Sequence, residues 1–571
     1  MTTIKKIDKD SAEGVDNRIT FFSVPATNVG IQRSSYKELL PLNALNQSAG
    51  PFIFRYFGDS LYLDLSKTYV WLALSLERKD VTSGEWVAIT DGTGDDLTGD
   101  KFVGLAQYLG LTWIRRLTLS INGVQCFDSG IHYAYRVIIM HALGANSEVS
   151  KGLYEAALYY TDGEDQNNFQ GDGFRARAER FANGKICRLF AHLDFDLARQ
   201  NQLLIPHSDV IWTLYRNSDD FLIHTPKYRK NAGDPLTDNT NTYRLRLHDL
   251  RIFVKQVDLS PSLNNAIARH LEQSPAKYAQ RKIEIRSVFL GKGRQEITHP
   301  TFTSTCPRRL VICFVSSGAF IGNKALSPFT FEHANLRSIS VEFGGFQFPA
   351  VPYDLDFLND NFVRAYVDMY LGMDLDSWPN LDQKTLAISM RKFASSCFFV
   401  IPMTSTLEDT NGLELIRQGT TTVKCLFNQP IKDEGYEMII MGEFDSILSI
   451  NADRILSTDG SRIPCEKEQG ASIGLLAIQI QKNTIEYFDS FAEEPNCDMR
   501  KSLLAKYSNV KQSRFVLQSS FSDTCGHYCI CFLVLRARYG NFSSVLQKLH
   551  SLPVEGRDIL LKNFVQRLSL L

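Results

Sequence analysis

From about residue 20 to residue 455 the sequence consists almost entirely of short strand-like runs. β-Branched and aromatic residues alternate with polar ones, as in SLYLDLSKTYVWLALSLER at 60–78 and YRLRLHDLRIFVKQV at 243–257. Helical periodicity is confined to three segments, 131–143, 262–272 and 360–371. Each alternating strand has one apolar face, and so many strands with so few helices can bury these faces only by packing sheet against sheet. The sequence therefore predicts a mainly β protein built from β-sandwiches.

An internal repeat indicates that there are two such sandwiches. IRRLTLSINGVQ at 114–125 and LRSISVEFGGFQ at 336–347 both alternate, and both turn at an Asn-Gly or Gly-Gly pair, which favours a two-residue hairpin with positive φ at both turn residues. YRVIIMHALG at 135–144 and VRAYVDMYLG at 363–372 follow these hairpins and share an Arg, the apolar spacing and a final Leu-Gly. Two hairpin–helix units in the same order predict a duplicated β domain. The alternative is a chance similarity between two amphipathic hairpins.

Charge and histidine spacing argue against several classes of function. The 62 Lys and Arg are balanced by 63 Asp and Glu, so a dominant nucleic-acid or acidic-membrane footprint is not expected. HTPKYRKN at 224–231 and the pair Arg308 and Arg309 are candidates for local genome contact, although a solvated loop or strand end is the favoured interpretation of each. His132 and His141 lack a two-His metal spacing and are expected to be surface or capped histidines. No cofactor and no metal are expected.

Cysteine usage indicates the compartment. The 11 cysteines are odd in number and scattered, and several lie in apolar runs, which is typical of reduced, buried thiols in the cytoplasm or nucleus. The N-terminal segment is charged and has no apolar signal-peptide core, and no run approaches the ~18 apolar residues of a membrane-spanning helix. We therefore expect an intracellular protein that is neither secreted nor inserted into a membrane.

The β region resembles a known family of capsid proteins. The matching stretches are VPATNVGIQRSSYKELLPLNAL at 24–45, LYLDLSKTYVWLALSL at 61–76, and the LTLSINGVQ hairpin with the helix after it. They are similar to the major capsid proteins of Polinton (Maverick) transposable elements. The resemblance implies tandem double jelly-roll sandwiches and a homotrimeric subunit that assembles into a capsid or virus-like particle, with a route to genome contact.

The pattern changes near the C-terminus. STDGSRIPCEKEQG at 457–470 is polar and rich in structure breakers, and an α/β pattern follows it. Strands are expected at 471–480, 484–488 and 513–518, and helices at 498–506 and 525–539. The expected division is a flexible arm at 1–19, a first jelly roll at 20–265, a second at 266–455, a linker at 456–470 and a small α/β (α+β) domain at 471–571.

The C-terminal segment carries a candidate nucleophile. QSSFSDTCGHYCICFL at 518–533 places Cys525 at the start of an expected helix, where free backbone N–H groups and the helix dipole favour thiolate. Gln518 is placed to donate its amide to a carbonyl oxygen under attack, and Asp489 to orient an imidazole. The strand ending in YFDS, the Gln and the CGxYC run resemble the adenovirus-type, adenain-like cysteine proteases, which are related to SUMO proteases. The resemblance implies catalytic roles for Cys525, Gln518 and Asp489.

The general base of that family is missing from its expected position. Where the family has a His-Trp pair, this sequence has Gly474 and Leu475. His527 lies two residues beyond Cys525, about 200° around the same helix, so it is poorly placed to accept the thiol proton. Loss of one triad member costs on the order of 10⁴ to 10⁶ in turnover. A zinc site from alternate residues of the CGHYCIC run is disfavoured because these side chains do not converge on a helix.

The leading hypothesis is a transposon-encoded, virus-like major capsid protein that carries an inactive, cysteine-protease-like C-terminal domain. Two alternatives remain open. One is an active adenain-type cysteine endopeptidase with a large β-rich accessory domain. The other is a domesticated host protein that binds partners through its sandwiches.

Overall fold

A computed structural model describes most of the chain before residue 459. The described residues are 24, 27–45, 50–90, 100, 103–144, 152–160, 171–225, 239–375, 388–404, 413, 417–432, 434–458, 477–481, 484–488 and 509–512. The chain divides into two compact units, Met1–Arg462 and Ile463–Leu571.

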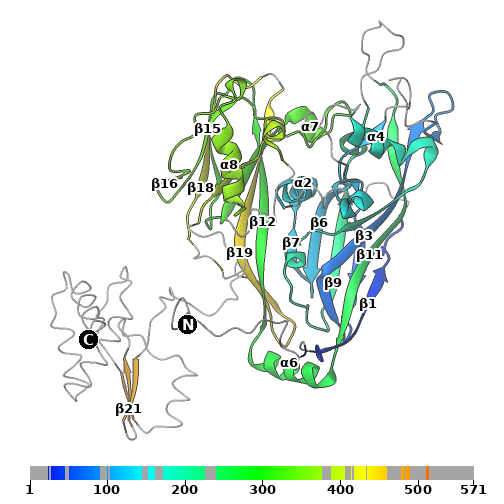
Figure 1. The fold of residues 1–571 in the computed structure, drawn as a ribbon. Helices are drawn as coiled ribbons and strands as arrows, with labels where there is room; N and C mark the ends of the chain where they lie inside the picture. The colour runs from blue at the N-terminus through cyan, green and yellow to red at the C-terminus, as the bar shows by residue number, and fades with distance from the viewer. Residues whose placement is uncertain are drawn as a thin grey trace, which may run out of the picture. The chain divides into compact units, whose positions relative to one another are not determined.

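The first half of the first unit forms a sandwich of two antiparallel sheets (Figure 1). One sheet has the order β1 (Ile31–Leu39), β11 (Tyr243–Leu259), β3 (Tyr62–Lys79) and β4 (Trp86–Ala88), with β8 (Cys187–His192) also paired to β3. The other has the order β2 (Phe52–Tyr56), β9 (Val210–Arg216), β6 (Ile114–Ile121) and β7 (Val124–Asp128). The short strands β5 (Gly104–Leu105) and β10 (Ile223–His224) pair with each other.

The second half repeats this arrangement. One sheet has the order β12 (Ala276–Leu290), β19 (Tyr436–Ile450), β14 (Arg309–Ser316) and β17 (Phe399–Pro402), with β20 (Leu456–Thr458) paired to β19. The other has the order β13 (Glu296–Phe302), β18 (Thr421–Phe427), β15 (Leu336–Phe343) and β16 (Phe346–Phe348).

Eight strands correspond one to one between the two sandwiches. In chain order, β1, β2, β3, β6, β7, β8, β9 and β11 take the same sheet positions as β12, β13, β14, β15, β16, β17, β18 and β19. Eight strands in two four-stranded sheets with connections that cross between the sheets define a jelly roll. The predicted fold class of tandem jelly rolls is therefore confirmed, and the repeat in the sequence is a real duplication of structure.

Helices connect and cover the sheets. The three segments with helical periodicity are helical: α2 (Tyr133–Gly144), α6 (Pro261–Gln273) and α8 (Val363–Gly372). The remaining helices are shorter: α1 (Leu109–Thr112), η3 (Gly130–His132), η4 (Leu153–Ala157), α4 (Asp172–Glu179), η5 (Ala182–Gly184), η6 (Asp196–Arg199), α5 (Asp219–Leu222), α7 (Ser317–Ile321), η7 (Phe357–Asn359) and α10 (Met390–Phe393). Helix α6 joins the two sandwiches and starts with proline at its first turn, where the missing N–H costs nothing.

Alternation in the sequence becomes alternation in burial. In β9, VIWTLYR, the side chains of Val210, Trp212 and Leu214 are fully buried, while the residues between them are partly exposed. Strand β14, RLVICFV, is buried at every position up to Val315 because it lies between β19 and β17 in its sheet and protein covers both of its faces. One continuous apolar core runs through both sandwiches.

The structure can be compared with the expected division at the linker and in the C-terminal α/β domain. Leu456–Thr458, assigned to the linker, instead form β20, because their backbone pairs with Leu448–Ile450 of β19. In the second unit, β21 (Ala477–Gln481) and β22 (Thr484–Phe488) are antiparallel, and β22 is parallel to β23 (Asn509–Gln512). The first two match expected strands, whereas β23 precedes the third, 513–518. That strand, both expected helices and the arm at 1–19 lie outside the described residues.

The two hairpin turns allow a matched test of the duplication. Gly123 and Gly345 have φ of +80° and +82°, and a Cβ at either would meet nothing within 4 Å. Gly123→Ala and Gly345→Ala should each lower the free energy of unfolding by about 1–2 kcal/mol, since left-handed backbone is unfavourable for L-residues. Thermal unfolding should show this as a fall of a few degrees.

The matched control is Gly144→Ala at the end of α2, where a Cβ also meets open space but φ lies outside the left-handed region. It should melt at or slightly above the temperature of the unchanged protein, because alanine is favoured over glycine in a helix. Equal melting of all three variants would show that the turn conformations are wrong.

Candidate functional site

Helix α2 makes an aromatic contact with the second sandwich. Nine of its twelve residues are buried. The ring of Tyr135 stacks on Phe320 of α7 with centroids 5.4 Å apart, and meets Phe329 edge-on at 5.8 Å. A helix of the first sandwich is thus covered by aromatic side chains of the second, and Figure 1 shows it between the two.

A buried ionic network lies beside this contact. The Arg136 guanidinium on α2 approaches Asp196 at 2.8 Å and Asp194 at 3.4 Å. Arg199 binds both oxygens of Asp194 at 2.8 Å. Arg136 also lies over the Phe127 ring, 5.0 Å from its centroid. Buried ions are tolerated only when paired and hydrogen-bonded, and this arrangement meets that condition for both carboxylates.

The pKa values of the two carboxyl groups are shifted in opposite directions. Burial by itself raises the pKa of Asp194, but Arg199 and Arg136 outweigh it and hold that pKa well below its usual range. Burial raises the pKa of Asp196 in spite of Arg136. The Ile283 backbone N–H of β12 donates to Asp196 at 3.4 Å, so the network reaches the second sandwich.

Further polar contacts cross the same interface. Ile205 N–H donates to the Tyr278 hydroxyl of β12 at 3.1 Å. The Arg454 side chain donates to Pro206 O at 2.9 Å, and Asn122 donates to Arg454 O at 2.9 Å. Strand β12 therefore serves as an edge that lies against the first sandwich along much of its length.

Both histidines singled out in the sequence belong to the interior, so the expectation of surface positions is wrong. His132 contacts Ser287 Oγ of β12 through Nε2 at 3.1 Å, and His141 lies against the rings of Tyr154 and Tyr159 at 4.4 and 4.0 Å. Burial lowers the pKa of each to about 4, helped by Arg286 near His132 and by Lys392 near His141.

The candidates for genome contact are also corrected. Arg308 and Arg309 are 2% and 4% exposed and therefore cannot reach a nucleic acid from these positions, nor are they solvated. Arg309 pairs with Glu443 of the neighbouring strand at 3.0 Å, because strands β14 and β19 lie side by side. In the 224–231 run, His224 and Thr225 are buried, and the rest lies outside the described residues.

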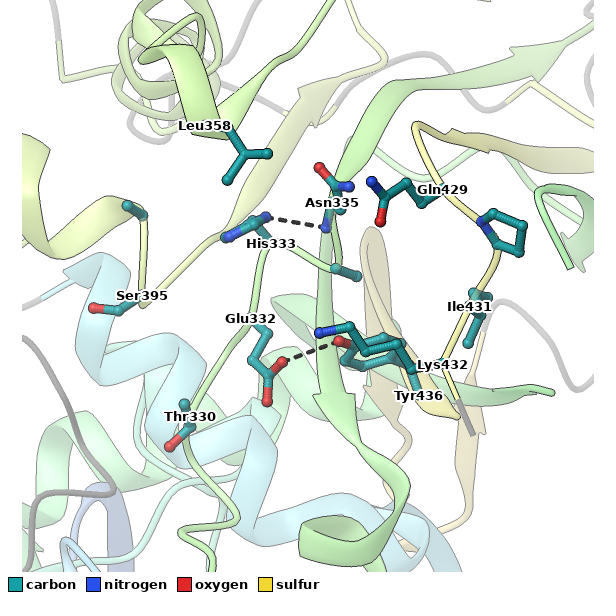
Figure 2. Close-up of a pocket in the computed structure, with 13 residues that line it drawn as sticks. Thr330, Glu332, His333, Asn335, Leu358, Ser395, Gln429, Ile431, Lys432 and Tyr436 are labelled. Atoms are coloured by element: carbon teal, nitrogen blue, oxygen red, sulfur yellow. Dashed lines mark hydrogen bonds between the residues drawn. The ribbon is translucent and has the colours of Figure 1, made fainter. Parts of the chain in front are cut away.

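A pocket of about 510 Å³ with both polar and apolar walls opens in the second sandwich (Figure 2). Its Tyr436 hydroxyl donates to Glu332 at 3.1 Å, and Asn335 N–H donates to His333 Nδ1 at 3.0 Å. The His333 ring stacks on Phe357 at 4.4 Å. These bonds fix the acid and the imidazole in separate places on the pocket wall.

The chemistry of this pocket favours binding over catalysis. Burial raises the pKa of Glu332 and lowers that of His333, so the wall presents a weak acid and a neutral ring. The Ser395 hydroxyl donates to Lys392 O and thus is not activated by His333. The pocket offers hydrogen bonds to a polar ligand and no nucleophile–base pair among these residues.

The predicted protease site is not part of the described structure. Cys525, Gln518, Asp489, Gly474 and His527 all lie outside the described residues. Strand β22 ends at Phe488, as predicted from the run before Asp489. The catalytic assignments stay predictions.

Three further features concern only the described residues. No group of three or more His, Cys, Asp or Glu is arranged to hold a metal among them. Their six cysteines, Cys126, Cys187, Cys306, Cys313, Cys397 and Cys425, are all free thiols. No helix in this part of the chain is both long and apolar enough to cross a membrane.

Comparison with known proteins agrees with this architecture. No family model matches the sequence. The uncharacterized protein F54H12.2 of Caenorhabditis elegans is 26% identical over 434 residues, which cover 75% of this chain and 97% of that protein. Among solved structures, a chain in the cryo-EM structure of the Sputnik virophage matches with a TM-score of 0.52 and 12% identity, over 80% of this chain and 94% of that one. The mavirus major capsid protein matches with a TM-score of 0.47 and 11% identity, over 80% and 97%.

The likeness to the Sputnik chain shows the fold. Together with the strand order, it shows that this protein has a double jelly-roll fold. The likeness extends over both sandwiches, because it covers four fifths of this chain and nearly all of the virophage chain.

Sequence reasoning missed the ionic network and the pocket. A signal for the network was present: an Arg occupies the same position in both repeat helices, and DFDLAR at 194–199 supplies two acids and a base within six residues. No signal marked the pocket, because its walls come from four separate stretches of the second sandwich.

The buried histidines predict a loss of stability in acid. An unfolded histidine has a pKa near 6.5, whereas these two have folded values of about 4. Below pH 6.5 the unfolded chain takes up protons that the folded chain does not accept until about pH 4, so the free energy of unfolding falls over that window. We expect each histidine to cost about 2 kcal/mol between pH 7.5 and pH 5.

The measurement is thermal unfolding at both pH values. His132→Gln should lose less stability on acidification than the unchanged protein, while His270→Gln, at an exposed position of α6, should lose as much. If His132→Gln and the unchanged protein lose stability equally, the burial of His132 does not control the acid response.

Proposed function

We propose that this chain is the subunit of a virus-like capsid shell of the Polinton (Maverick) type, encoded by a transposable element. The duplication carries the proposal: two eight-strand jelly rolls in the same strand order on one chain. The structural similarity to a chain of the Sputnik virophage supports the proposal, since that chain has the same fold. A shell subunit needs rigid sandwiches with packed inner faces, and loops and edges that meet neighbours, and no catalytic constellation.

The subunit is proposed to form homotrimers, because two jelly rolls in each of three chains supply the six-sided outline implied by the family resemblance. Trimers then assemble into a shell within the cytoplasm or nucleus. Contact with a packaged genome is part of this proposal, although neither Arg308 nor Arg309 serves it.

The assembly proposal predicts a size. Native mass spectrometry of the purified full chain should give a species of three times 64.6 kDa, and negative-stain microscopy should show hexagonal capsomers or closed shells. A protein that stays monomeric at micromolar concentrations under a range of ionic strengths would contradict the capsid function. It would instead favour the domesticated host protein that binds partners through its sandwiches.

The C-terminal unit is proposed to be an inactive remnant of an adenain-like protease. Cys525, Gln518 and Asp489 match the family positions, and Gly474 stands where the general base belongs. Without an imidazole to accept the thiol proton and protonate the leaving amine, peptide hydrolysis fails even where the thiolate forms.

A cleavage assay decides between remnant and enzyme. The full chain should release no more fluorophore from a panel of peptide substrates than its Cys525→Ala variant does, since the base is missing. Turnover that depends on Cys525, together with labelling of Cys525 by a cysteine-protease probe, would establish the active endopeptidase instead.

A further inference from the structure

The pocket near His333 in the second sandwich has no part in the proposed shell function. Its volume of about 510 Å³ lies within the ~300–1,000 Å³ range of small-ligand sites. A shell subunit needs packed sheets and neighbouring subunits, which leaves a hollow with several polar groups on its walls without a role. The charge, the hydrogen-bonding groups and the anchoring of the walls determine what the hollow can bind.

The charge on the walls is balanced. Among the thirteen described residues that line the pocket, Lys432 and Glu332 carry charge at neutral pH. Burial and the nearby Lys432 lower the pKa of His333, so its ring is neutral. An anionic ligand would meet a carboxylate beside the ammonium, and a cationic ligand would meet an ammonium beside the carboxylate. The walls therefore favour a ligand that carries no charge.

Three side chains in the pocket present hydrogen-bonding groups to a ligand. Asn335 N–H donates to His333 Nδ1 at 3.0 Å, so the neutral ring carries its proton on Nε2 and can donate it. Figure 2 shows the side-chain amides of Asn335 and Gln429 pointing toward each other, and neither amide is hydrogen-bonded to another group in the described part of the chain. An amide both donates and accepts, and so does a hydroxyl. Adjacent hydroxyl groups therefore match this pair of amides.

Apolar surface lies beside these polar groups. Leu358, Ala394 and Pro430 supply it, and Leu358 is 79% exposed. A ring that carries C–H groups between its hydroxyls can cover this surface while its hydroxyls reach the amides. A wholly apolar ligand would instead bury the amides and the imidazole N–H without partners, which is unfavourable. A neutral sugar meets both requirements.

The walls are anchored by main-chain hydrogen bonds. Ile431 N–H donates to Arg294 O at 3.0 Å, and Ile431 O accepts from Gly293 N–H at 2.9 Å. Asn428 N–H donates to Asn335 O at 3.0 Å, which joins the stretch that carries the glutamine to the stretch that carries the asparagine. A site formed in advance in this way loses little binding free energy to the ordering of its own loops.

We propose that this pocket is a binding site for a neutral monosaccharide. The amides of Asn335 and Gln429 bind adjacent hydroxyl groups, the His333 N–H and the Lys432 ammonium donate to sugar oxygens, and the sugar ring covers Leu358. The site is independent of the proposed shell function, because all of these residues belong to the second sandwich of a single chain.

Saturation-transfer difference NMR on the purified full chain tests the ligand class. The neutral probes are glucose, galactose, mannose and N-acetylglucosamine, and the charged probes are glucose 6-phosphate, sialic acid and alanine. At least one neutral sugar should bind. Its Kd should be the same at about 50 and about 500 mM NaCl, because salt screens attraction between charges and a neutral sugar has none.

Variants then place the sugar in the pocket. Gln429→Ala removes an exposed amide and should weaken binding about tenfold, as expected for the loss of one or two hydrogen bonds. Asn335→Gly should have a similar effect, and glycine accepts the left-handed φ of 53° at that position. Gln347→Ala is the matched control, since Gln347 is an exposed glutamine of β16 outside the pocket, and its Kd should be unchanged. Circular dichroism and melting show that each variant folds.

Three results would overturn the proposal. They are the absence of transfer to all four neutral sugars, binding of the charged probes alone, and a folded Gln429→Ala variant that binds sugar as tightly as the unchanged protein. None of them affects the shell proposal, which depends on the assembly state.

Discussion

Helix α2 is apolar on several sides and carries an arginine, so it is stable only where protein covers it all round. The first sandwich covers one side, and the aromatic side chains of Phe320 and Phe329 cover another. The Arg136 charge is then met by Asp194 and Asp196 inside the protein. Because this burial needs both sandwiches at once, it fixes the second sandwich against the first. The burial of α2 between the two sandwiches therefore makes the pair of jelly rolls one structural unit.

The same geometry explains why the copies of the duplication differ on the outside. Arg364 of α8 occupies the place of Arg136, yet it is exposed and pairs with Asp368 on its own helix at 3.6 Å. Its repeat partner Arg136 is buried, paired with Asp194 and Asp196 and lying over Phe127. A single pattern of helix residues therefore leads to a core in one half and to a surface in the other, according to what lies beyond the helix. The proposed shell function would use such uncovered surfaces to bind neighbouring subunits.

The pocket near His333 and the ionic network differ in kind. The network is largely buried and holds its charges by pairing, which suits a structural role. The lowered pKa of Asp194 makes stability depend on pH. The pocket is open and has mixed polar and apolar walls, and the hydrogen bonds of Glu332 and His333 hold these two residues apart. Neither contains the nucleophile and base of a hydrolase among its residues. These residues of the pocket and the network thus provide no counterpart of the cysteine-protease site predicted from the C-terminal motif.

Period-two alternation located β3 and β11, the paired turn residues located both hairpins, and the repeated Arg and Leu-Gly located the second helix. These signals are local in the chain. Burial was decided only by the fold. His132 and Arg308 read as surface residues in isolation, and they lie inside because Ser287 and Glu443, more than 130 positions away, are brought against them. Which helix face meets another sandwich and which stays uncovered depends on contacts between segments hundreds of residues apart, which no local pattern encodes.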